Sequence, residues 1–343
     1  MLSPATVGGV SERDLIARIR AALPPAPPWQ LVGIGDDAAV VEPERNRVEV
    51  LTVDAIVEGI HFDRAFVPAE AIGHRALAVN LSDLAAMGAA PRLALLSMAL
   101  PSTLPLVDFD AIVAGFVALA RRSKIHVAGG NLTRSPGPLM IDTTVMGTVK
   151  RRQALTRSGA RPNDDVYVSG SIGGARAGLQ LLQTAAETAD RGLIAAYLRP
   201  EPRLALGMHL SRNRAASACM DLSDGLSDGL EQIAEASGVG MTIDAGALPI
   251  DPAARAFFER GGVDAIVESL RGGDDYELLL TVRPRTSRRL AEAVRRGGVP
   301  LTRIGRCTAE RGIVLTGAAA VPSGALPHGF SHFARANETG AGA

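Results

Sequence analysis

The chain has 343 residues, of which 47% are hydrophobic and only 3% aromatic, so it holds enough apolar side chains for two aliphatic cores. Lysine plus arginine and aspartate plus glutamate number 36 each, and this zero formal charge excludes the basic excess typical of nucleic-acid-binding proteins. The two cysteines, Cys219 and Cys307, lack the close spacing of a zinc site or a disulfide framework.

The sequence also lacks the apolar segments of secreted and membrane-spanning proteins. Residues 1–9 contain neither the basic start nor the apolar stretch of a signal peptide. The longest apolar runs, such as residues 111–120, are about half of the ~20 residues that a spanning helix needs. We therefore expect a cytoplasmic protein with no membrane partner.

The first 150 residues contain both helix and strand signals. Ser11 and Asp14 have the spacing of a capping box, and the prolines between Pro24 and Pro28 must end the helix that starts there. The glycine-rich residues 129–134 are expected to form a loop. Apolar periodicity predicts further helices at 69–87 and 109–122, and strands at 48–53, 93–100, 125–128 and 139–149.

A basic, polar stretch at residues 150–162 marks the expected domain boundary. Two acidic turns follow later in the chain, one leading into a helix at 220–237 and the other into a strand that ends at 282. We also predict strands at 165–169, 241–244, 299–305 and 313–315, and helices at 175–188 and 203–210. Because helices and strands do not alternate strictly, we expect an α+β fold with two domains, residues 1–150 and 151–343.

Aspartates gather at five places where folding alone gives no reason for them. Like charges repel each other, and an unpaired carboxylate is costly to bury. Magnesium resolves this conflict, because it prefers oxygen ligands and is usually held by a few carboxylates together with substrate phosphates. The pattern therefore predicts a Mg²⁺-dependent phosphotransferase. The acids are Asp36 with Asp37, Asp54, Asp83, Asp221 with Asp224 and Asp228, and Asp274 with Asp275.

Acids at three of these five places also have a purely structural explanation. Asp54 is explained as the end of a strand, Asp83 as part of a solvated helix stripe, and the acids at 221–228 as helix caps. However, Asp83 shares a helix face with Asn80 among apolar neighbours. A cap, moreover, does not need three acids in eight positions.

The glycine-rich residues 129–134 and His61 are weaker candidates. The backbone N–H groups near Gly130 are suited to a phosphate, with Arg134 pairing its oxygens, although Gly-Gly-Asn is also a common turn. A lone histidine such as His61 is more often structural than functional. No GxxxxGK[ST] loop, protein-kinase HRD or DFG motif, or dinucleotide-binding glycine fingerprint is present, which excludes these nucleotide-binding classes.

Seven segments in chain order resemble the thiamine-monophosphate kinase family, within the superfamily of aminoimidazole ribonucleotide synthetase. The resemblance covers residues 12–333, and its sixth and seventh segments are specific to the kinases. The segments are Gly33-Ile-Gly-Asp-Asp37, Thr52-Val-Asp54 with His61-Phe62, Asn80-Leu-Ser-Asp-Leu-Ala-Ala-Met-Gly-Ala89, Leu155-Thr-Arg-Ser-Gly-Ala-Arg-Pro162, Met220-Asp-Leu-Ser-Asp-Gly225, Gly272-Gly-Asp-Asp-Tyr-Glu-Leu278 and Gly329-Phe-Ser-His-Phe333.

This resemblance implies direct in-line transfer of the ATP γ-phosphate onto thiamine monophosphate, giving thiamine diphosphate. It also implies an N-terminal sheet-and-helix domain that pairs in a homodimer, and a C-terminal α/β sandwich domain that completes the active site. The implied ligands of several Mg²⁺ ions are Asp37, Thr52, Asp54, Asp83, Asn131, Asp221 and Asp224. The implied ATP contacts are Gly130, Asn131, Arg157 and Ser223. The implied contacts to thiamine monophosphate are His61, Asp275 and Phe330.

Three positions depart from the family pattern. Asn131 stands where the family has an aspartate, Ser123 replaces an aromatic residue, and Val53 replaces a hydroxyl residue. We therefore expect one Mg²⁺ to be held more weakly at Asn131 or to be held by a neighbouring residue, and Ser123 offers no ring for the adenine stacking that the family pattern implies. No general base is assigned, because the acceptor is already a phosphate oxygen. Two alternatives stay open: an ATP-using superfamily member with a different small-molecule acceptor, and a nucleotide-binding homologue without turnover.

Overall fold

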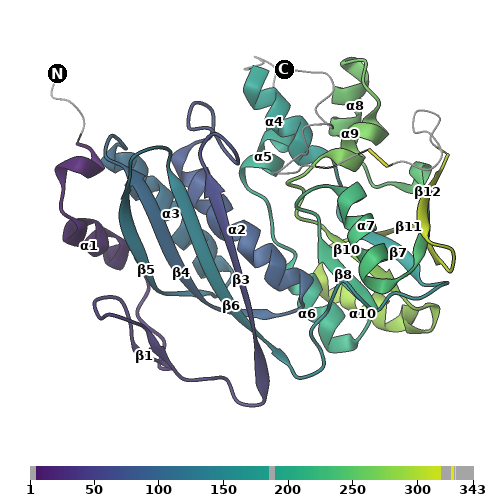
Figure 1. The fold of residues 1–343 in the computed structure, drawn as a ribbon, viewed down its shortest axis with the longest axis horizontal. Coiled ribbons are helices and arrows are strands. Elements are labelled where there is room, and N and C mark those ends of the chain that lie inside the picture. The colour runs from purple at the N-terminus through teal and green to yellow at the C-terminus, as the bar shows by residue number, and fades with distance from the viewer. Residues whose placement is uncertain (1–4, 185–189, 318–325, 328, 330–343) are drawn as a thin grey trace.

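Two sheets organise the chain, one in each half. The computed structural model describes residues 5–184, 190–317, 326, 327 and 329. Its N-terminal half is built on a four-stranded sheet and its C-terminal half on a six-stranded sheet, and the halves lie side by side (Figure 1). Within the described ranges, no helix is long and apolar enough to cross a membrane.

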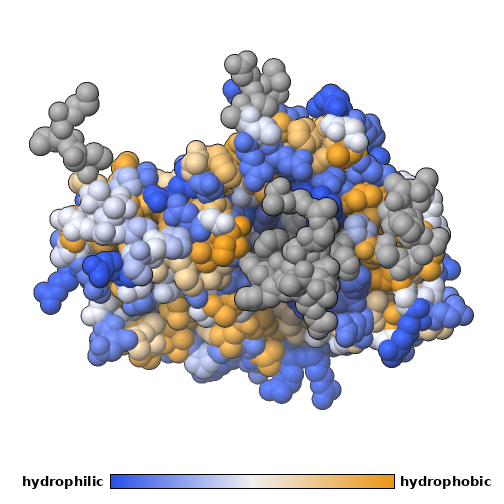
Figure 2. All heavy atoms as spheres, turned by 45° about the horizontal axis from the view of Figure 1, so that its top comes forward, coloured by the Kyte–Doolittle hydropathy of each residue, from blue (hydrophilic) through white to orange (hydrophobic). Residues whose placement is uncertain are grey.

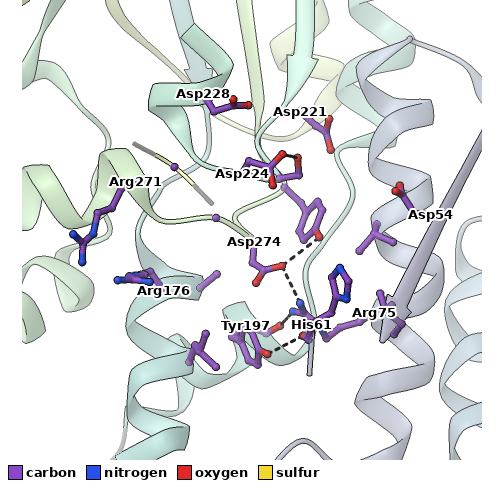
Figure 3. A pocket seen from close by; sticks show the side chains of 18 of the residues that line it. Asp54, His61, Arg75, Arg176, Tyr197, Asp221, Asp224, Asp228, Arg271 and Asp274 are labelled. Atoms are coloured by element: carbon purple, nitrogen blue, oxygen red, sulfur yellow. Dashed lines mark hydrogen bonds and ion pairs between the residues drawn. The ribbon is translucent and has the colours of Figure 1, made fainter. Parts of the chain in front are cut away.

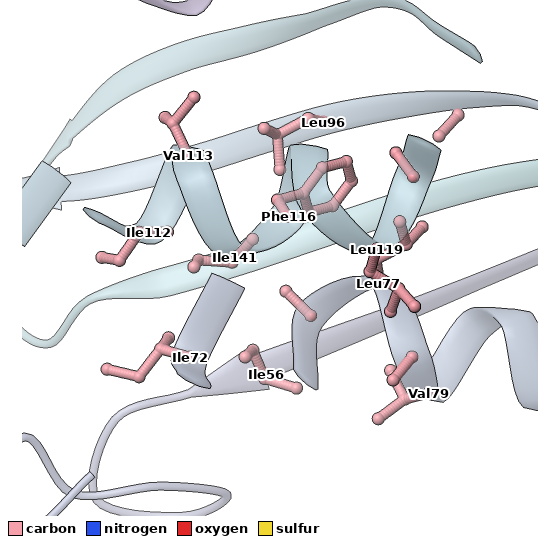
Figure 4. Close-up of a cluster of buried hydrophobic side chains, with 14 of the residues drawn as sticks. Ile56, Ile72, Leu77, Val79, Leu96, Ile112, Val113, Phe116, Leu119 and Ile141 are labelled. Atoms are coloured by element: carbon pink, nitrogen blue, oxygen red, sulfur yellow. The ribbon is translucent and has the colours of Figure 1, made fainter. Parts of the chain in front are cut away.

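The N-terminal sheet has the strand order β3-β6-β4-β5, in which only β4 and β5 run parallel. Helices α2 and α3 cover one of its faces, and their apolar side chains meet those of the strands in the main core, as Leu77, Phe116 and Ile141 show (Figure 4). The elements are a 3₁₀ turn at Val7–Gly9, α1 (Glu12–Ala22), β1 (Gln30–Val32), β2 (Val40–Val41), β3 (Arg47–Val57), α2 (Ala69–Ala86), β4 (Ala90–Pro101), α3 (Leu106–Arg122), β5 (His126–Ser135) and β6 (Met140–Lys150).

Helix α2 occupies the centre of the molecule. It contacts α3, β3 and β6 in its own half, and α6 and β8 in the other half. Most of the helix is surrounded by protein, which explains why 15 of its residues are buried and why no single apolar stripe stands out. Glycines let it approach α3 closely: a Cβ on Gly73 would lie 1.8 Å from the Ile112 carbonyl oxygen, and one on Gly115 would lie 1.9 Å from that of Glu70.

The C-terminal sheet has the strand order β12-β9-β11-β7-β10-β8, and only β12 and β9 pair in parallel. Its elements are β7 (Asp165–Ser169), α4 (Gly174–Thr184), α5 (Arg191–Leu198), α6 (Leu204–Asn213), β8 (Ala218–Asp221), α7 (Leu226–Ser237), β9 (Gly240–Asp244), α8 (Pro252–Arg260), α9 (Ala265–Arg271), β10 (Leu278–Val282), α10 (Ser287–Gly297), β11 (Leu301–Thr308) and β12 (Gly312–Thr316), with 3₁₀ turns at Ala245–Ala247 and Pro284–Thr286.

Two predictions near the expected site were wrong. Residues 129–134 do not form a loop, because they continue strand β5 alongside β4. Gly130 makes this pairing possible, since a Cβ there would lie 1.8 Å from the Leu96 carbonyl oxygen. Asp54 does not end its strand, because β3 continues to Val57, opposite Met140.

The sequence analysis also missed several elements of the C-terminal half, although their start signals are present. Helices α5, α8 and α9 begin after Asp190, Asp251 and Asp264, whose side chains cap the first N–H groups of each helix. Helix α10 was missed as well, and Asp221 belongs to the end of strand β8 rather than to an acidic turn. The division at residue 150 stays a prediction.

The face of the N-terminal sheet that α2 and α3 leave uncovered carries exposed apolar side chains. Leu51 and Val53 on β3 are 66% and 57% exposed, and Leu95 on β4 is 37% exposed. The strand register places all three on this face. An apolar sheet face of this kind is typical of an interaction surface.

Candidate functional site

A cavity of about 1030 Å³ opens where the two halves of the chain meet. Hydrophilic side chains are visible in the hollow between the halves (Figure 2). Strand β3, helix α2 and the segment between them contribute one wall. Helices α4, α5 and α7, the β8–α7 turn, the α9–β10 loop and Arg157 line other parts of the cavity. The polar lining residues are Asp54, His61, Arg75, Asp83, Arg157, Arg176, Tyr197, Asp221, Ser223, Asp224, Ser227, Asp228, Glu231, Arg271, Asp274 and Tyr276.

Four of the predicted metal ligands face this cavity from four separate segments. Asp54 lies on β3, Asp83 on α2, Asp221 at the end of β8 and Asp224 in the turn before α7. Figure 3 shows three of them, Asp54, Asp221 and Asp224, in one part of the site. Among the described residues, no three His, Cys, Asp or Glu side chains form a ready-made metal cluster. The carboxylates are therefore spread along the wall.

Hydroxyl and amide groups hold these acids in place. The Thr52 hydroxyl donates a hydrogen bond to Asp83, so Thr52 supports an acid although it does not itself line the cavity. The Ser82 hydroxyl donates to Asp221 Oδ2 at 2.6 Å. The Asp54 backbone N–H donates to Asn80 Oδ1 at 3.0 Å, which ties strand β3 to helix α2.

The acids disfavour each other's ionised forms. Burial raises the pKa of Asp221, which is only 5% exposed, and the charge of Asp83 raises it further. Asp54 stays accessible to water, but its enclosure by the cavity wall, followed by the charge of Asp83, raises its pKa as well. A cation placed among these groups would relieve the repulsion.

A different set of groups surrounds His61 and Asp274. His61 Nδ1 accepts a hydrogen bond from the Val57 N–H at 3.0 Å, so the neutral ring carries its proton on Nε2. The Asp274 carboxylate accepts from Arg75 at 2.8 Å and from the Tyr276 hydroxyl at 3.2 Å (Figure 3). This end of the cavity combines one imidazole, one carboxylate and aromatic rings.

Asp274 lines the cavity, whereas Asp275, the acid expected from the resemblance, does not. The Asp275 carboxylate accepts hydrogen bonds from the N–H groups of Gly173 at 2.9 Å and Ala175 at 3.4 Å, at the start of α4. Asp275 therefore stabilises the fold beside the site, and its role in substrate binding stays a prediction.

The structure places the other predicted site residues as follows. Arg157 and Ser223 line the cavity, and Arg157 donates to the Gln232 side chain. Asp37 is exposed between β1 and β2, and does not line the cavity. Gly130 and Asn131 lie on β5, where Asn131 pairs with Ser97 on the uncovered face of the sheet, opposite to the face of Asp54. Phe330 lies outside the described residues.

Three arginines of the cavity wall escaped the sequence analysis. Arg176 and Arg271 both contact the Glu268 carboxylate, at 3.1 and 2.9 Å, and this shared partner holds them together. Arg75 belongs to α2, and the sequence contained a signal for it: a charged residue followed by the apolar residues 76–79 in a helix expected to be largely buried.

The two halves of the chain match two family models. Residues 35–149 match the AIR synthase related protein, N-terminal domain, and residues 161–318 match the AIR synthase related protein, C-terminal domain. The thiamine-monophosphate kinase of Salmonella typhimurium is 41% identical over 285 residues, which is 81% of this chain and 84% of that protein. The thiamine-monophosphate kinase of Bacillus subtilis is 37% identical over 279 residues, 80% of this chain and 84% of that protein.

Solved structures resemble the fold of this chain over most of its length. Thiamine-monophosphate kinase from Stenotrophomonas maltophilia is 42% identical with a TM-score of 0.80, over 91% of this chain and 98% of that chain. AaThiL in complex with AMPPCP and TMP is 34% identical with a TM-score of 0.75, over 88% of this chain and 92% of that chain. Escherichia coli HypE, at 22% identity and a TM-score of 0.75, shares the fold.

Proposed function

This chain belongs to the thiamine-monophosphate kinase family, and on that premise we propose that it transfers the γ-phosphate of ATP to thiamine monophosphate, yielding thiamine diphosphate and ADP. The observation that carries the proposal is the cavity at the junction of the two halves, which combines four aspartates with His61 and Asp274. Residues 1–150 and 151–343 would then act as two domains that share one active site.

We propose that Asp54, Asp83, Asp221 and Asp224 hold Mg²⁺ ions, with Thr52 completing the set. The donor chemistry fits, since hard cations prefer carboxylate and hydroxyl oxygens and usually take their remaining ligands from substrate phosphates. The mutual repulsion of Asp54, Asp83 and Asp221 supports the assignment. When bound, Mg²⁺ would neutralise the charge of the phosphates that meet here. Asp37 and Asn131 are retained as proposed ligands, although neither lines the cavity of a single protomer.

The two substrates would occupy different parts of the cavity. We assign Arg157 and Ser223, together with Gly130 and Asn131, to ATP. We assign His61 and Asp274 to thiamine monophosphate, whose thiazolium ring is a cation that an adjacent carboxylate stabilises. Asp275 and Phe330 remain proposed acceptor contacts from the family resemblance alone.

Positioning and electrostatics would supply the catalysis. The attacking atom is an oxygen of an already ionised phosphate, so no side chain needs to remove a proton from it. The aspartates would hold the cations that the phosphate groups need, and Arg157 would pair with phosphate oxygens and orient them. Closure of the cavity over both substrates would exclude water, which would otherwise compete as the acceptor.

We further propose a homodimer that joins two copies through the uncovered face of the N-terminal sheet. The exposed Leu51, Val53 and Leu95 support this, because they would be buried against the second copy. We propose a cytoplasmic location, since Cys219 and Cys307 are buried free thiols, which suit a reducing compartment.

A direct assay tests the function. Purified protein is incubated with ATP and Mg²⁺, with and without thiamine monophosphate, and both ADP and the thiamine product are quantified by chromatography. We expect one thiamine diphosphate per ADP, and no ADP without the acceptor. Turnover with a different small-molecule phosphate would point to another activity of the superfamily. ATP binding without any turnover would indicate a nucleotide-binding homologue.

A further inference from the structure

Arg75 places a buried positive charge between the two halves of the chain. It lies on α2, is 1% exposed as a residue, and is the largest fully buried side chain in the described part of the protein. A guanidinium group keeps its charge at this depth when an opposite charge and hydrogen bonds compensate it. Nη1 and Nη2 of Arg75 have such partners, whereas its buried Nε has none among the described residues. The partners of Nη1 and Nη2 belong to the C-terminal half and border the acceptor end of the cavity.

The guanidinium group of Arg75 joins two segments that border the cavity. Its Nη2 forms an ion pair with Asp274 Oδ1 at 2.8 Å, and its Nη1 donates to the Tyr197 carbonyl oxygen. It also lies over the Tyr197 ring, with its central carbon 4.3 Å from the ring centroid. The Tyr197 hydroxyl in turn donates to the His61 carbonyl oxygen at 3.1 Å. One side chain thus links Asp274 directly, and His61 through Tyr197.

The loop that carries Asp274 has an unfavourable backbone. Asp274 and Tyr276 both have left-handed conformations, with φ of 68° and 48°, which are strained for residues other than glycine. Their N–H groups donate to the carbonyl oxygens of Ser223 and Leu222, at 2.7 and 2.9 Å. Two kinds of contact therefore maintain this backbone conformation: the backbone hydrogen bonds to the β8–α7 turn and the ion pair between Asp274 and Arg75.

We propose that Arg75 is a positioning residue for the acceptor, which fixes the Asp274 carboxylate and the His61 segment at the spacing that a cationic, phosphate-bearing acceptor requires. The inference rests on the proposed function, because it names a determinant of the same acceptor site. Arg75 and Tyr276 both use Oδ1 of Asp274, so Oδ2 is the oxygen left for the acceptor. Arg75 itself acts through Asp274 and Tyr197.

We expect lysine to be a poor replacement for arginine in this role. A guanidinium group reaches Asp274 and the Tyr197 carbonyl with two different nitrogens while its plane stacks on the ring. An ammonium group has three donors on one nitrogen and no plane, so it does not reproduce the fixed spacing or the stacking. The variant Arg75→Lys therefore keeps the buried positive charge, and we expect it to fold. It no longer fixes the positions of Asp274 and Tyr197 relative to each other.

The test is a double-mutant cycle of Arg75→Lys and Asp274→Asn. Calorimetry in Mg²⁺ measures the Kd for thiamine monophosphate and, separately, for a non-hydrolysable ATP analogue. We expect Arg75→Lys to raise the Kd for thiamine monophosphate about tenfold, equivalent to about 1.4 kcal/mol. The Kd for the nucleotide analogue should stay within about twofold. In the Asp274→Asn background, Arg75→Lys should raise the Kd for thiamine monophosphate by clearly less than in the wild type, because the charge of residue 274 has been removed while the Arg75 contacts to Tyr197 remain.

Arg203 offers a matched control. It also forms an ion pair across distant segments, with two of its nitrogens on the Glu277 carboxylate, but it does not line the cavity. Arg203→Lys should lower the melting temperature and leave both Kd values unchanged. The proposal would be overturned if Arg75→Lys raised the Kd values for thiamine monophosphate and for the nucleotide analogue equally. It would also be overturned if Arg75→Lys raised the Kd for thiamine monophosphate by the same tenfold in the Asp274→Asn background. The proposed function is judged independently, by thiamine diphosphate formation in the wild type, so either idea can fail while the other stands.

Discussion

Replacing Asp83 with asparagine separates the function of the acidic cluster from its effect on folding. Asparagine has nearly the same shape and keeps an oxygen that can accept the Thr52 hydroxyl hydrogen bond. Only the charge is lost. If Asp83 holds a cation at the transferring phosphate, turnover should fall by about 10²-fold or more, as when one well-placed electrostatic stabiliser is removed.

The same change should stabilise the protein in the absence of ligands. Burial first, and the charge of Asp83 second, raise the pKa of Asp221 from 3.8 to about 7. At 1.36 kcal/mol per pH unit this corresponds to about 4 kcal/mol in total. The charge of Asp83 is one cause of this shift, second to burial, so its removal should stabilise the fold, by an amount on the order of 1 kcal/mol.

The pH of the measurement follows from the sign of this effect. The pKa of Asp221 is higher in the folded chain than in the unfolded chain, so the folded state binds more protons between pH 4 and about 7. Folding stability therefore falls as the pH rises through that range, and the full repulsion is present above about pH 7. Urea unfolding at pH 8, without Mg²⁺, should show the gain in Asp83→Asn.

The surface variant Asp110→Asn is the control. Asp110 is an exposed helix aspartate that pairs only with Arg18 among the described residues, so its replacement should change neither turnover nor stability appreciably. Near-normal turnover of Asp83→Asn at saturating Mg²⁺ would refute the assignment of Asp83 as a metal ligand. If Asp83→Asn were less stable to urea than the wild type at pH 8, the acids would not repel one another in the ligand-free protein.

Three further outcomes are expected. Gly115→Ala should destabilise the fold by about 3 kcal/mol or more in urea unfolding, because its Cβ would meet the Glu70 carbonyl oxygen at 1.9 Å, whereas Gly137→Ala, with no atom within 4 Å, should be neutral. Leu51→Glu should convert dimers to monomers in sedimentation velocity, and a wild type that sediments as a monomer would contradict the proposed interface. Asp274→Asn should raise the KM for thiamine monophosphate about tenfold while that for ATP stays nearly constant, and equal changes in both constants would contradict its assignment to the acceptor.

Local spacing in the sequence was enough to predict the helices with strong boundary signals. The capping box of Ser11 and Asp14 is present in the structure, and α2 and α3 lie where apolar periodicity placed them. The acids that face the cavity were also predicted from the sequence, because Asp54 and Asp83 stand among apolar residues, and the three acids at 221–228 are more than a helix cap needs. Signals of this kind depend on neighbours within a few residues, which a sequence displays directly.

Contacts between distant segments determined the rest. Residues 129–134 were predicted to form a loop because Gly129 and Gly130 favour turns. In the structure they pair with β4 and belong to an edge strand. The choice between Asp274 and Asp275 is also tertiary, since both acids follow the same two glycines. Backbone bonds to the β8–α7 turn and the guanidinium of Arg75 turn Asp274 into the cavity, while the start of α4 captures Asp275. Two adjacent aspartates thus have different roles, one lining the cavity and one bonding to the start of α4, because their partners come from different parts of the chain.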